Sequence, residues 1–138
     1  MFFRNLFFYT LPEISAVTNE ALESALQAAA LRPVGALAMQ SRGFVPPLGE
    51  SGALLQGIEN SLWLCLGGED RILPAAVVQR ECQLKIAELE QAKGHPLGKR
   101  ARAQLKQETL DTLMPRAFVK PSRLNAVINR KRSFIAID

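Results

Sequence analysis

The sequence has 138 residues, of which 48% are apolar, so the chain can bury the core of one domain and is too apolar to be disordered. Its formal net charge of +4 is unevenly spread, because residues 93–138 hold 11 Lys and Arg against 3 Asp and Glu, whereas residues 1–92 hold 6 against 10. This asymmetry indicates either a basic face for an anionic partner or a solvated basic surface without one. No apolar run approaches the roughly 20 residues of a membrane span.

The N-terminal residues predict a strand followed by a helix. Phe2–Tyr9 is short and aromatic, which is typical of a strand with both faces partly covered. No small-residue cleavage site follows it, so it is not interpreted as a signal peptide. Thr18 or Asn19 can cap the helix, which carries Leu and Ala on one side and is expected to end at Arg32-Pro33.

Residues 36–73 predict short strands joined by turns. Two consecutive prolines, Pro46 and Pro47, lack backbone donors and predict a loop, and Glu59-Asn60 lies between two apolar runs as the turn of a hairpin. We expect, in order, a strand at 36–40, a loop at 44–49, paired strands at 53–58 and 61–66, a turn at 67–70 and a short strand at 71–73.

The next 40 residues have helical periodicity. Apolar side chains repeat at helical spacing from Ala75 to about Gln91, and the Gly- and Pro-rich segment 94–98 interrupts the pattern. A second helix is expected from about Lys99 to Leu113, which makes an antiparallel hairpin. On this second helix, three cations lie on the same side as three apolar residues: Lys99, Arg102 and Lys106 with Leu110, Leu113 and Met114.

Two strands, 122–129 and 133–138, are expected to close the fold around a basic turn. The predicted fold class is therefore α+β. A mixed or antiparallel sheet is built from residues 1–73 and 115–138, one helix packs on it, and an antiparallel helical hairpin projects at 74–114.

Residue types that carry catalysis or bind metals are sparse. His95 is the single histidine, in a Gly/Pro turn without a second ligand at metal spacing, and neither Cys65 nor Cys82 belongs to a CxxC pair. Ser51 does not fit the G-x-S-x-G nucleophile elbow, because Ala53 stands where the last glycine should be. Gly67-Gly68 forms no phosphate-binding motif. We expect buried, inert thiols in a reducing cytoplasm, and no catalytic site, metal or cofactor.

The cations of the C-terminal third are the candidate binding residues. Lys and Arg neutralise phosphates, and no aromatic side chains interleave with them to stack on bases, so contacts to a nucleic-acid backbone are favoured over reading of sequence. A solvated surface is the alternative. The candidate residues are Lys99, Arg100, Arg102, Lys106, Arg116, Lys120, Arg123, Arg130, Lys131 and Arg132.

Phe118 follows the helical hairpin and lies between two cations, Arg116 and Lys120. Either it belongs to the core, or it is an anchor at a subunit contact, where aromatic residues are enriched. An assembly module that uses Phe118 and the apolar root of the hairpin is therefore the alternative to nucleic-acid binding.

Several short motifs together resemble the N-terminal part of the RdgC family of recombination-associated proteins. They come in the family's order and spacing: Phe3-Arg4-Asn5-Leu6 with Tyr9, Gly43-Phe44-Val45-Pro46-Pro47, Ile72-Leu73-Pro74 and Leu113-Met114-Pro115-Arg116-Ala117-Phe118. The resemblance covers the whole chain and less than half of the family's usual length. A fragment or a truncated relative is therefore expected.

The resemblance implies a function without enzymatic activity. RdgC proteins bind double-stranded DNA with little sequence preference as a ring-shaped homodimer, restrain the RecA recombinase, and act in recombination and replication. The resemblance thus implies a protein of the cytoplasm and nucleoid with no membrane contact, basic residues on or near the DNA face, and Phe118 at a dimer contact.

Overall fold

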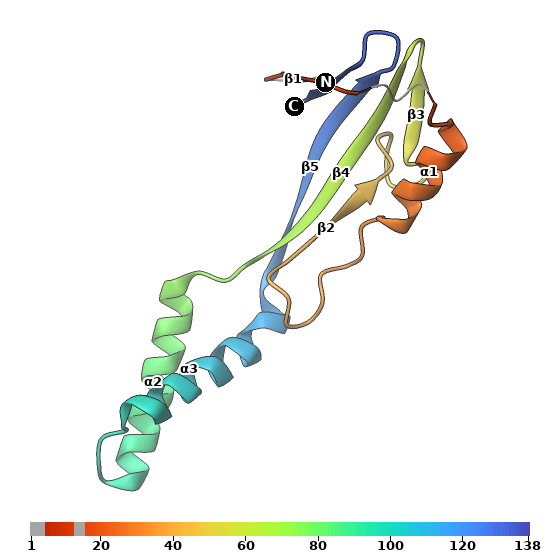
Figure 1. Cartoon of the computed structure of the whole chain (residues 1–138). Helices are drawn as coiled ribbons and strands as arrows, with labels where there is room; N and C mark the ends of the chain where they lie inside the picture. The colour runs from red at the N-terminus through yellow and green to blue at the C-terminus, as the bar shows by residue number, and fades with distance from the viewer. Residues whose placement is uncertain (1–4, 13–15) are drawn as a thin grey trace. The chain divides into compact units, whose positions relative to one another are not determined.

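The computed structural model describes residues 5–12 and 16–138 and has the predicted α+β class. Six strands form one antiparallel sheet, and three helices accompany it (Figure 1). The elements are β1 (Phe7–Thr10), α1 (Asn19–Ala28), β2 (Gln40–Val45), β3 (Leu55–Ile58), β4 (Ser61–Ile72), α2 (Ala75–Lys93), α3 (Lys99–Leu113), a 3-10 turn (Met114–Arg116), β5 (Phe118–Asn129) and β6 (Phe134–Ile137).

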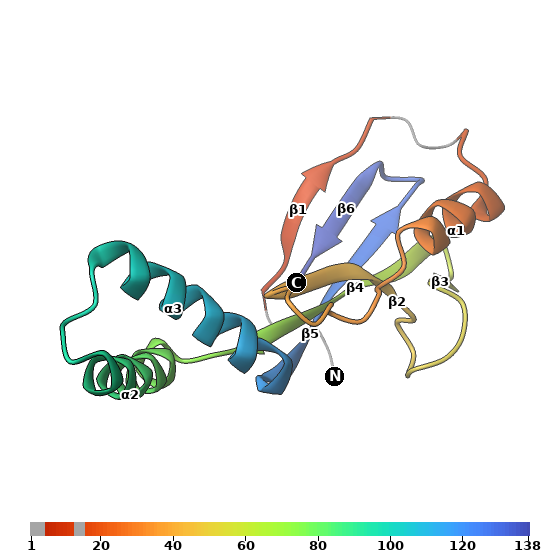
Figure 2. The same cartoon turned by 90° about the horizontal axis from the view of Figure 1, so that it is seen from below.

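The chain divides into two compact units. The first contains Met1–Pro33, Ser41–Glu69 and Pro121–Asp138, and the second contains Val34–Gln40 and Asp70–Lys120. The strand order is β1-β6-β5-β4-β2. In addition, β3 pairs with the first residues of β4, from Ile58 opposite Ser61 to Leu55 opposite Leu64. Figure 2 shows β1 beside β6, where Phe7 is paired with Ile137 and Thr10 with Phe134.

The core of the first unit lies between α1 and the sheet. Leu26 of α1 is buried in one cluster with four side chains of the strands, namely Leu62, Leu64, Ala126 and Ile128, and with Leu54. Thr18 caps α1 as predicted, because its hydroxyl accepts a hydrogen bond from the Ala21 backbone N–H at 3.1 Å.

The second unit is built around the pair α2 and α3, whose bounds agree with the predicted hairpin. Gly94 ends α2 in the left-handed conformation, with φ of 71°, which glycine adopts without strain. The buried residues of the pair are Val78, Cys82, Leu97, Leu105 and Thr109. Leu105 and Thr109 are the buried positions of α3, so its inner stripe is offset from the predicted one through Leu110, Leu113 and Met114.

The Arg71 side chain links two segments of the second unit by hydrogen bonds. Its guanidinium donates to three backbone carbonyl oxygens, those of Ala38 at 3.1 Å, Gly35 at 3.1 Å and Met114 at 2.8 Å. One side chain thereby joins residues 34–40 to the end of α3.

Two predictions about the strands are wrong. A strand was expected at 36–40, but β2 begins at Gln40 and includes Phe44 and Val45, which were assigned to a loop. The expected turn at 67–70 is part of the continuous strand β4. The aromatic strand was expected to have both faces partly covered, and Phe7 and Phe8 are 62% and 63% exposed, so the cover on each face is slight; residues 2–4 of that prediction lie outside the described residues.

Within the described residues, no helix combines the length and the apolar character needed to cross a lipid bilayer.

Candidate nucleic-acid interface

The predicted cations lie in both units. Lys99, Arg100, Arg102 and Lys106 are on α3, Arg116 is in the 3-10 turn, and Lys120 and Arg123 are on β5; Arg130, Lys131 and Arg132 follow β5 in its turn to β6. Lys120 belongs to the second unit and Arg123 to the first, so each unit has its own set.

The first turn of α3 departs from the usual chemistry of a helix N-terminus. Gly98 is the N-cap and supplies no capping side chain, and no acidic residue lies in the first turn. Instead, Lys99 and Arg100 stand there, both exposed. Backbone N–H groups at a helix N-terminus carry partial positive charge, so nearby cations are unfavourable unless an anion binds. The contrast is α1, which has the Thr18 cap and Glu20 in its first turn.

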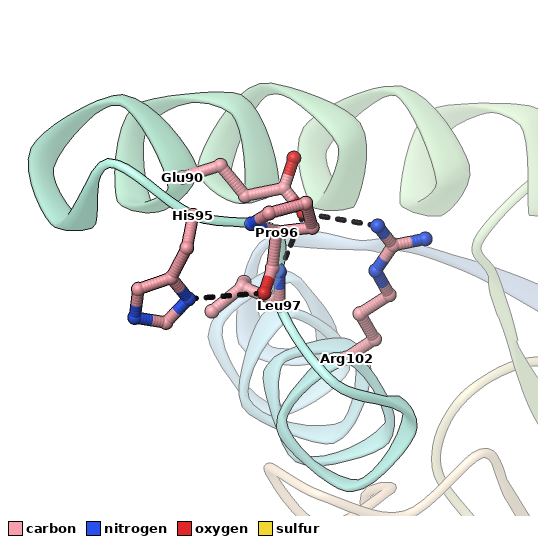
Figure 3. Close-up of polar contacts among 5 residues, drawn as sticks. All are labelled: Glu90, His95, Pro96, Leu97 and Arg102. Atoms are coloured by element: carbon pink, nitrogen blue, oxygen red, sulfur yellow. Dashed lines mark hydrogen bonds and ion pairs between the residues drawn. The ribbon is translucent and has the colours of Figure 1, made fainter.

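Arg102 is held by the turn that joins the two helices. One carboxylate oxygen of Glu90 accepts hydrogen bonds from the Leu97 backbone N–H at 2.8 Å and from an Arg102 terminal nitrogen at 2.9 Å (Figure 3). The Leu97 N–H first, and then Arg102, hold the pKa of Glu90 below its usual range. The Arg102 side chain is still 50% exposed, so it can contact an anion while it stabilises the turn.

Lys106 borders an apolar groove of about 600 Å³ on the helix pair. The groove is lined mainly by Leu73, Val78, Cys82, Ile86 and Leu110. Lys106 and Leu110 therefore do lie on one side of α3, as their spacing predicted.

Arg123 forms part of the fold of the first unit. Its guanidinium donates to the carbonyl oxygens of Pro46, Pro47 and Gly49, and so holds the loop that follows β2. The terminal N–H groups of Arg123 that make these bonds are therefore not available to donate to a phosphate. The sequence does not reveal this role, because Arg123 and the loop are more than 70 residues apart.

The three cations of the turn Arg130-Lys131-Arg132 differ in exposure: Arg130 is partly buried, whereas the other two are exposed. The Nε and one terminal nitrogen of Arg130 are buried without a hydrogen-bond partner in the described structure. Lys131 and Arg132 are exposed and line a polar hollow of about 390 Å³. Arg123 and Arg130 are seven positions apart along β5, about 23 Å of extended chain, so the first unit does not bring them together.

Phe118 is 84% exposed at the start of β5, so the alternative that it belongs to the core is wrong for the described residues.

The remaining candidates lie as follows. His95 is in the turn between the helices, with its Nδ1 at 3.1 Å from the Pro96 carbonyl oxygen (Figure 3). Cys65 and Cys82 are buried and unpaired. Across residues 5–12 and 16–138, no three His, Cys, Asp or Glu side chains gather in a way that would hold a metal ion.

Comparison with known proteins gives one consistent result. A protein-family profile described as "Putative exonuclease, RdgC" matches residues 1–138. Proteins named recombination-associated protein RdgC are similar over the whole chain. Those of Xanthomonas oryzae pv. oryzae, Xylella fastidiosa and Stenotrophomonas maltophilia are 42%, 44% and 44% identical over 140 residues, which cover 46% of each relative.

The chain thus spans about half the length of the curated relatives that it matches. The family match covers every position, including the motifs around Phe44, Leu73 and Phe118 that carried the resemblance in the sequence. This chain belongs to the RdgC family.

Proposed function

We propose that this chain contacts the phosphates of double-stranded DNA without reading base sequence, as part of an RdgC protein that acts in recombination and replication. The first turn of α3 carries the proposal. Lys99 and Arg100 stand at a helix N-terminus that has neither a capping side chain nor an acidic residue. A bound phosphate would satisfy the free N–H groups and both cations together.

Other exposed cations extend this surface chemistry. Lys106, Arg116 and Lys120 are exposed in the second unit, and Lys131 and Arg132 are exposed in the first. Phe118 lies between two of them, Arg116 and Lys120, and a single aromatic side chain does not make a platform on which successive bases stack. We assign direct phosphate contacts to these residues and to Arg102, whose side chain is 50% exposed. Arg123 and Arg130 support the fold around them.

The test is fluorescence anisotropy of a labelled duplex against this chain from low to high salt. Each phosphate contact contributes about 0.9 to the slope of log K against log salt. The double variant Lys99→Ala/Arg100→Ala should therefore reduce the slope by about 2 and weaken binding at low salt by tenfold or more. The matched control is Arg80→Ala/Lys93→Ala, which removes the same charge from α2.

Equal losses in the two double variants would mean that net charge, and not the start of α3, determines affinity. Binding that is indifferent to salt would contradict phosphate contacts altogether. Scrambling the duplex sequence should change the affinity by less than about twofold, because phosphates carry no sequence information directly.

The proposal is binding without cleavage. The family description contains the word exonuclease, so the distinction needs a direct experiment. A duplex labelled at one end should keep its full length after incubation with this chain and Mg²⁺ or Mn²⁺. Progressive shortening that depends on the metal would instead establish an exonuclease.

We extend the proposal to the partners that the family resemblance implies. They are a second copy of the protein in a ring-shaped dimer and the RecA recombinase, whose access to DNA an encircling protein would restrain. The corresponding location is the nucleoid in the cytoplasm.

A second candidate function is assembly alone, and the exposure of Phe118 favours it. An aromatic side chain that is 84% exposed in this form provides apolar area for a subunit contact, and the apolar groove of the same unit could receive such a side chain. Salt discriminates between the candidates, because apolar association does not weaken as salt rises whereas phosphate binding does.

A further inference from the structure

An apolar groove of about 600 Å³ lies on the helix pair of the second unit, and both helices contribute to its lining. In this lining, Val78 and Cys82 are buried, whereas Ile86 and Leu110 are half-buried. The volume falls within the range of roughly 300–1,000 Å³ that is usual for ligand pockets. The groove therefore has room for one or two large apolar side chains.

A row of cations continues from the groove along one side of α3. Lys106 lines the groove, is exposed, and has no hydrogen-bond or ion-pair partner in the part of the chain that the structure describes. Arg102 and Lys99 follow one and two turns nearer the start of α3, on the same side as Lys106 by helical spacing. At about 1.5 Å per residue the row spans about 10 Å, which is the length of about three extended peptide residues.

This side of the helix pair carries little negative charge. Four acidic residues lie about 140° or more around their helix axes from the groove residues Gln79 and Lys106, by helical spacing. They are Glu81, Glu88, Glu108 and Asp111. The acidic residue on the groove side is Glu90, and its carboxylate accepts from the Leu97 N–H and from Arg102, whose side chain is 50% exposed (Figure 3). The row therefore attracts an anionic partner.

Gln79 and Gln83 indicate which kind of anion fits. Both line the groove, both are exposed, and they lie about one turn apart on α2. Each amide has donors and an acceptor, so the pair suits both the N–H and the C=O groups of an extended peptide. The sugar-phosphate backbone of DNA has no N–H donor and no apolar side chain, and a fatty acid carries one charged group. The apolar lining, the two amides and the row of cations together match a peptide.

We propose that the groove binds a short segment of a partner protein in which acidic residues adjoin one or two large apolar side chains. The apolar side chains occupy the space beside Val78 and Ile86, and the carboxylates lie along Lys106, Arg102 and Lys99. This inference goes beyond DNA binding and does not depend on it, because the experiment below contains no nucleic acid.

The experiment titrates this chain into a fluorescein-labelled peptide, Asp-Glu-Asp-Gly-Leu-Phe, and follows its fluorescence anisotropy. Two control peptides each remove one half of the recognition. Replacement of the acidic residues by Asn-Gln-Asn should weaken binding by about tenfold or more, because charge-assisted hydrogen bonds are lost. Replacement of Leu-Phe by Ser-Ser should weaken it by about 100-fold, because two apolar side chains are no longer buried.

Variants at exposed positions locate the peptide on the helix pair. Ala75 lines the groove and Ala76 does not, and both are exposed on α2. Ala75→Phe fills the groove and should weaken binding by about tenfold or more, whereas Ala76→Phe adds the same side chain outside the groove and should leave the affinity unchanged. Because exposed positions tolerate substitution, both variants should keep the fold, which circular dichroism checks.

Lys106→Gln tests the charged half. It should weaken the acidic peptide by about tenfold and leave the Asn-Gln-Asn peptide unchanged, since that peptide has no carboxylate for Lys106 to bind. Arg80→Gln is the matched control, because it removes one exposed cation from α2 away from the groove lining, and it should affect neither peptide.

Equal affinities for the acidic and the Asn-Gln-Asn peptides, or equal losses in Ala75→Phe and Ala76→Phe, would overturn the proposal. A second copy of the chain is the competing occupant. If neither the wild type nor Phe118→Ala binds the peptide, and Ala75→Phe abolishes self-association in sedimentation velocity, the groove is a contact between copies and the proposal is wrong. If dodecanoate displaces the labelled peptide at lower concentration than the unlabelled peptide does, the groove is a site for small apolar acids, and the peptide assignment is wrong.

Discussion

Glu90 closes the turn between α2 and α3 with one carboxylate oxygen. That oxygen accepts from the Leu97 N–H and from Arg102, and both bonds favour the ionised carboxylate. The pKa of Glu90 is therefore lower in the folded chain than in the unfolded chain. Such a group stabilises the fold above its unfolded pKa, and the stabilisation disappears as the pH falls through its folded pKa.

Glu90→Gln should accordingly lower the thermal midpoint at pH 7 relative to the wild type. The difference should shrink below about pH 4.3, where the unfolded carboxyl group becomes protonated, and vanish at lower pH. Thermal unfolding followed by circular dichroism from pH 2 to 7 measures it. Glu88→Gln, which changes an exposed carboxylate of the same helix, is the control. A Glu90 effect that did not depend on pH would show that the ionised form has no special role.

The sequence predicts which residues of the candidate site are cations, but not which of them are bonded within the fold. The sequence identifies the cations, because residue type alone decides charge. It does not distinguish exposed Lys99 from Arg102, which bonds Glu90, or from Arg123, which bonds the loop after β2. The difference arises from partners that the fold brings near, 12 residues away for Arg102 and 77 for Arg123.

β2 packs closely against the chain after α1, and Gly43 makes this approach possible. The chain after α1 runs beside β2, where the Phe44 N–H donates to the Ala29 carbonyl and the Leu31 N–H donates to the Phe44 carbonyl, both at 2.9 Å. A Cβ on Gly43 would lie 2.4 Å from the Leu31 Cα and N, and backbone atoms cannot move aside as a flexible side chain can.

Gly43→Ala should therefore destabilise the chain by about 3 kcal/mol, at the upper end for overpacking. Urea unfolding gives the value. Gly57→Ala on β3 is the matched control, because no atom lies within 4 Å of its added Cβ, and it should change the stability by less than about 1 kcal/mol. Similar losses at both positions would mean that glycine flexibility, and not the close approach at Gly43, is the cause.

The same close packing limited the prediction of strands. Gly67 and Gly68 were interpreted as a turn, but added Cβ atoms would lie 2.6 Å from Val45 and from Ser122, so glycine allows β4 to pass close to its neighbours. The helix pair was predicted well because its periodicity is local. Strand identity in 40–72 depends on which segments pair, and a single sequence does not contain that information directly.

Phe118 could join two copies of the chain. Phe118 exposes most of a large apolar side chain, and burial of such a side chain contributes about 1.5–3 kcal/mol. In a symmetric dimer the residue would be buried twice, so the contact would contribute about 3–6 kcal/mol. This is enough to decide between monomer and dimer at micromolar concentration.

Phe118→Ala should raise the dissociation constant of a dimer by more than about 100-fold. Sedimentation velocity over a range of concentrations, in about 0.5 M salt, measures self-association under conditions in which screening suppresses phosphate contacts. Leu84→Ala is the control, because it truncates another exposed apolar side chain, 52% exposed, on α2. If both variants behave like the wild type, Phe118 does not anchor a contact between copies.

If copies associate through Phe118, self-association should strengthen DNA binding, because a dimer is bivalent. A dimer presents the start of α3 twice, and the second phosphate contact becomes intramolecular once the first is made. Phe118→Ala, which removes no charge, should therefore weaken DNA binding and reduce its salt slope only at concentrations where the wild type is dimeric. A Phe118 variant that dissociates but binds DNA with an unchanged slope would show that each copy binds DNA independently.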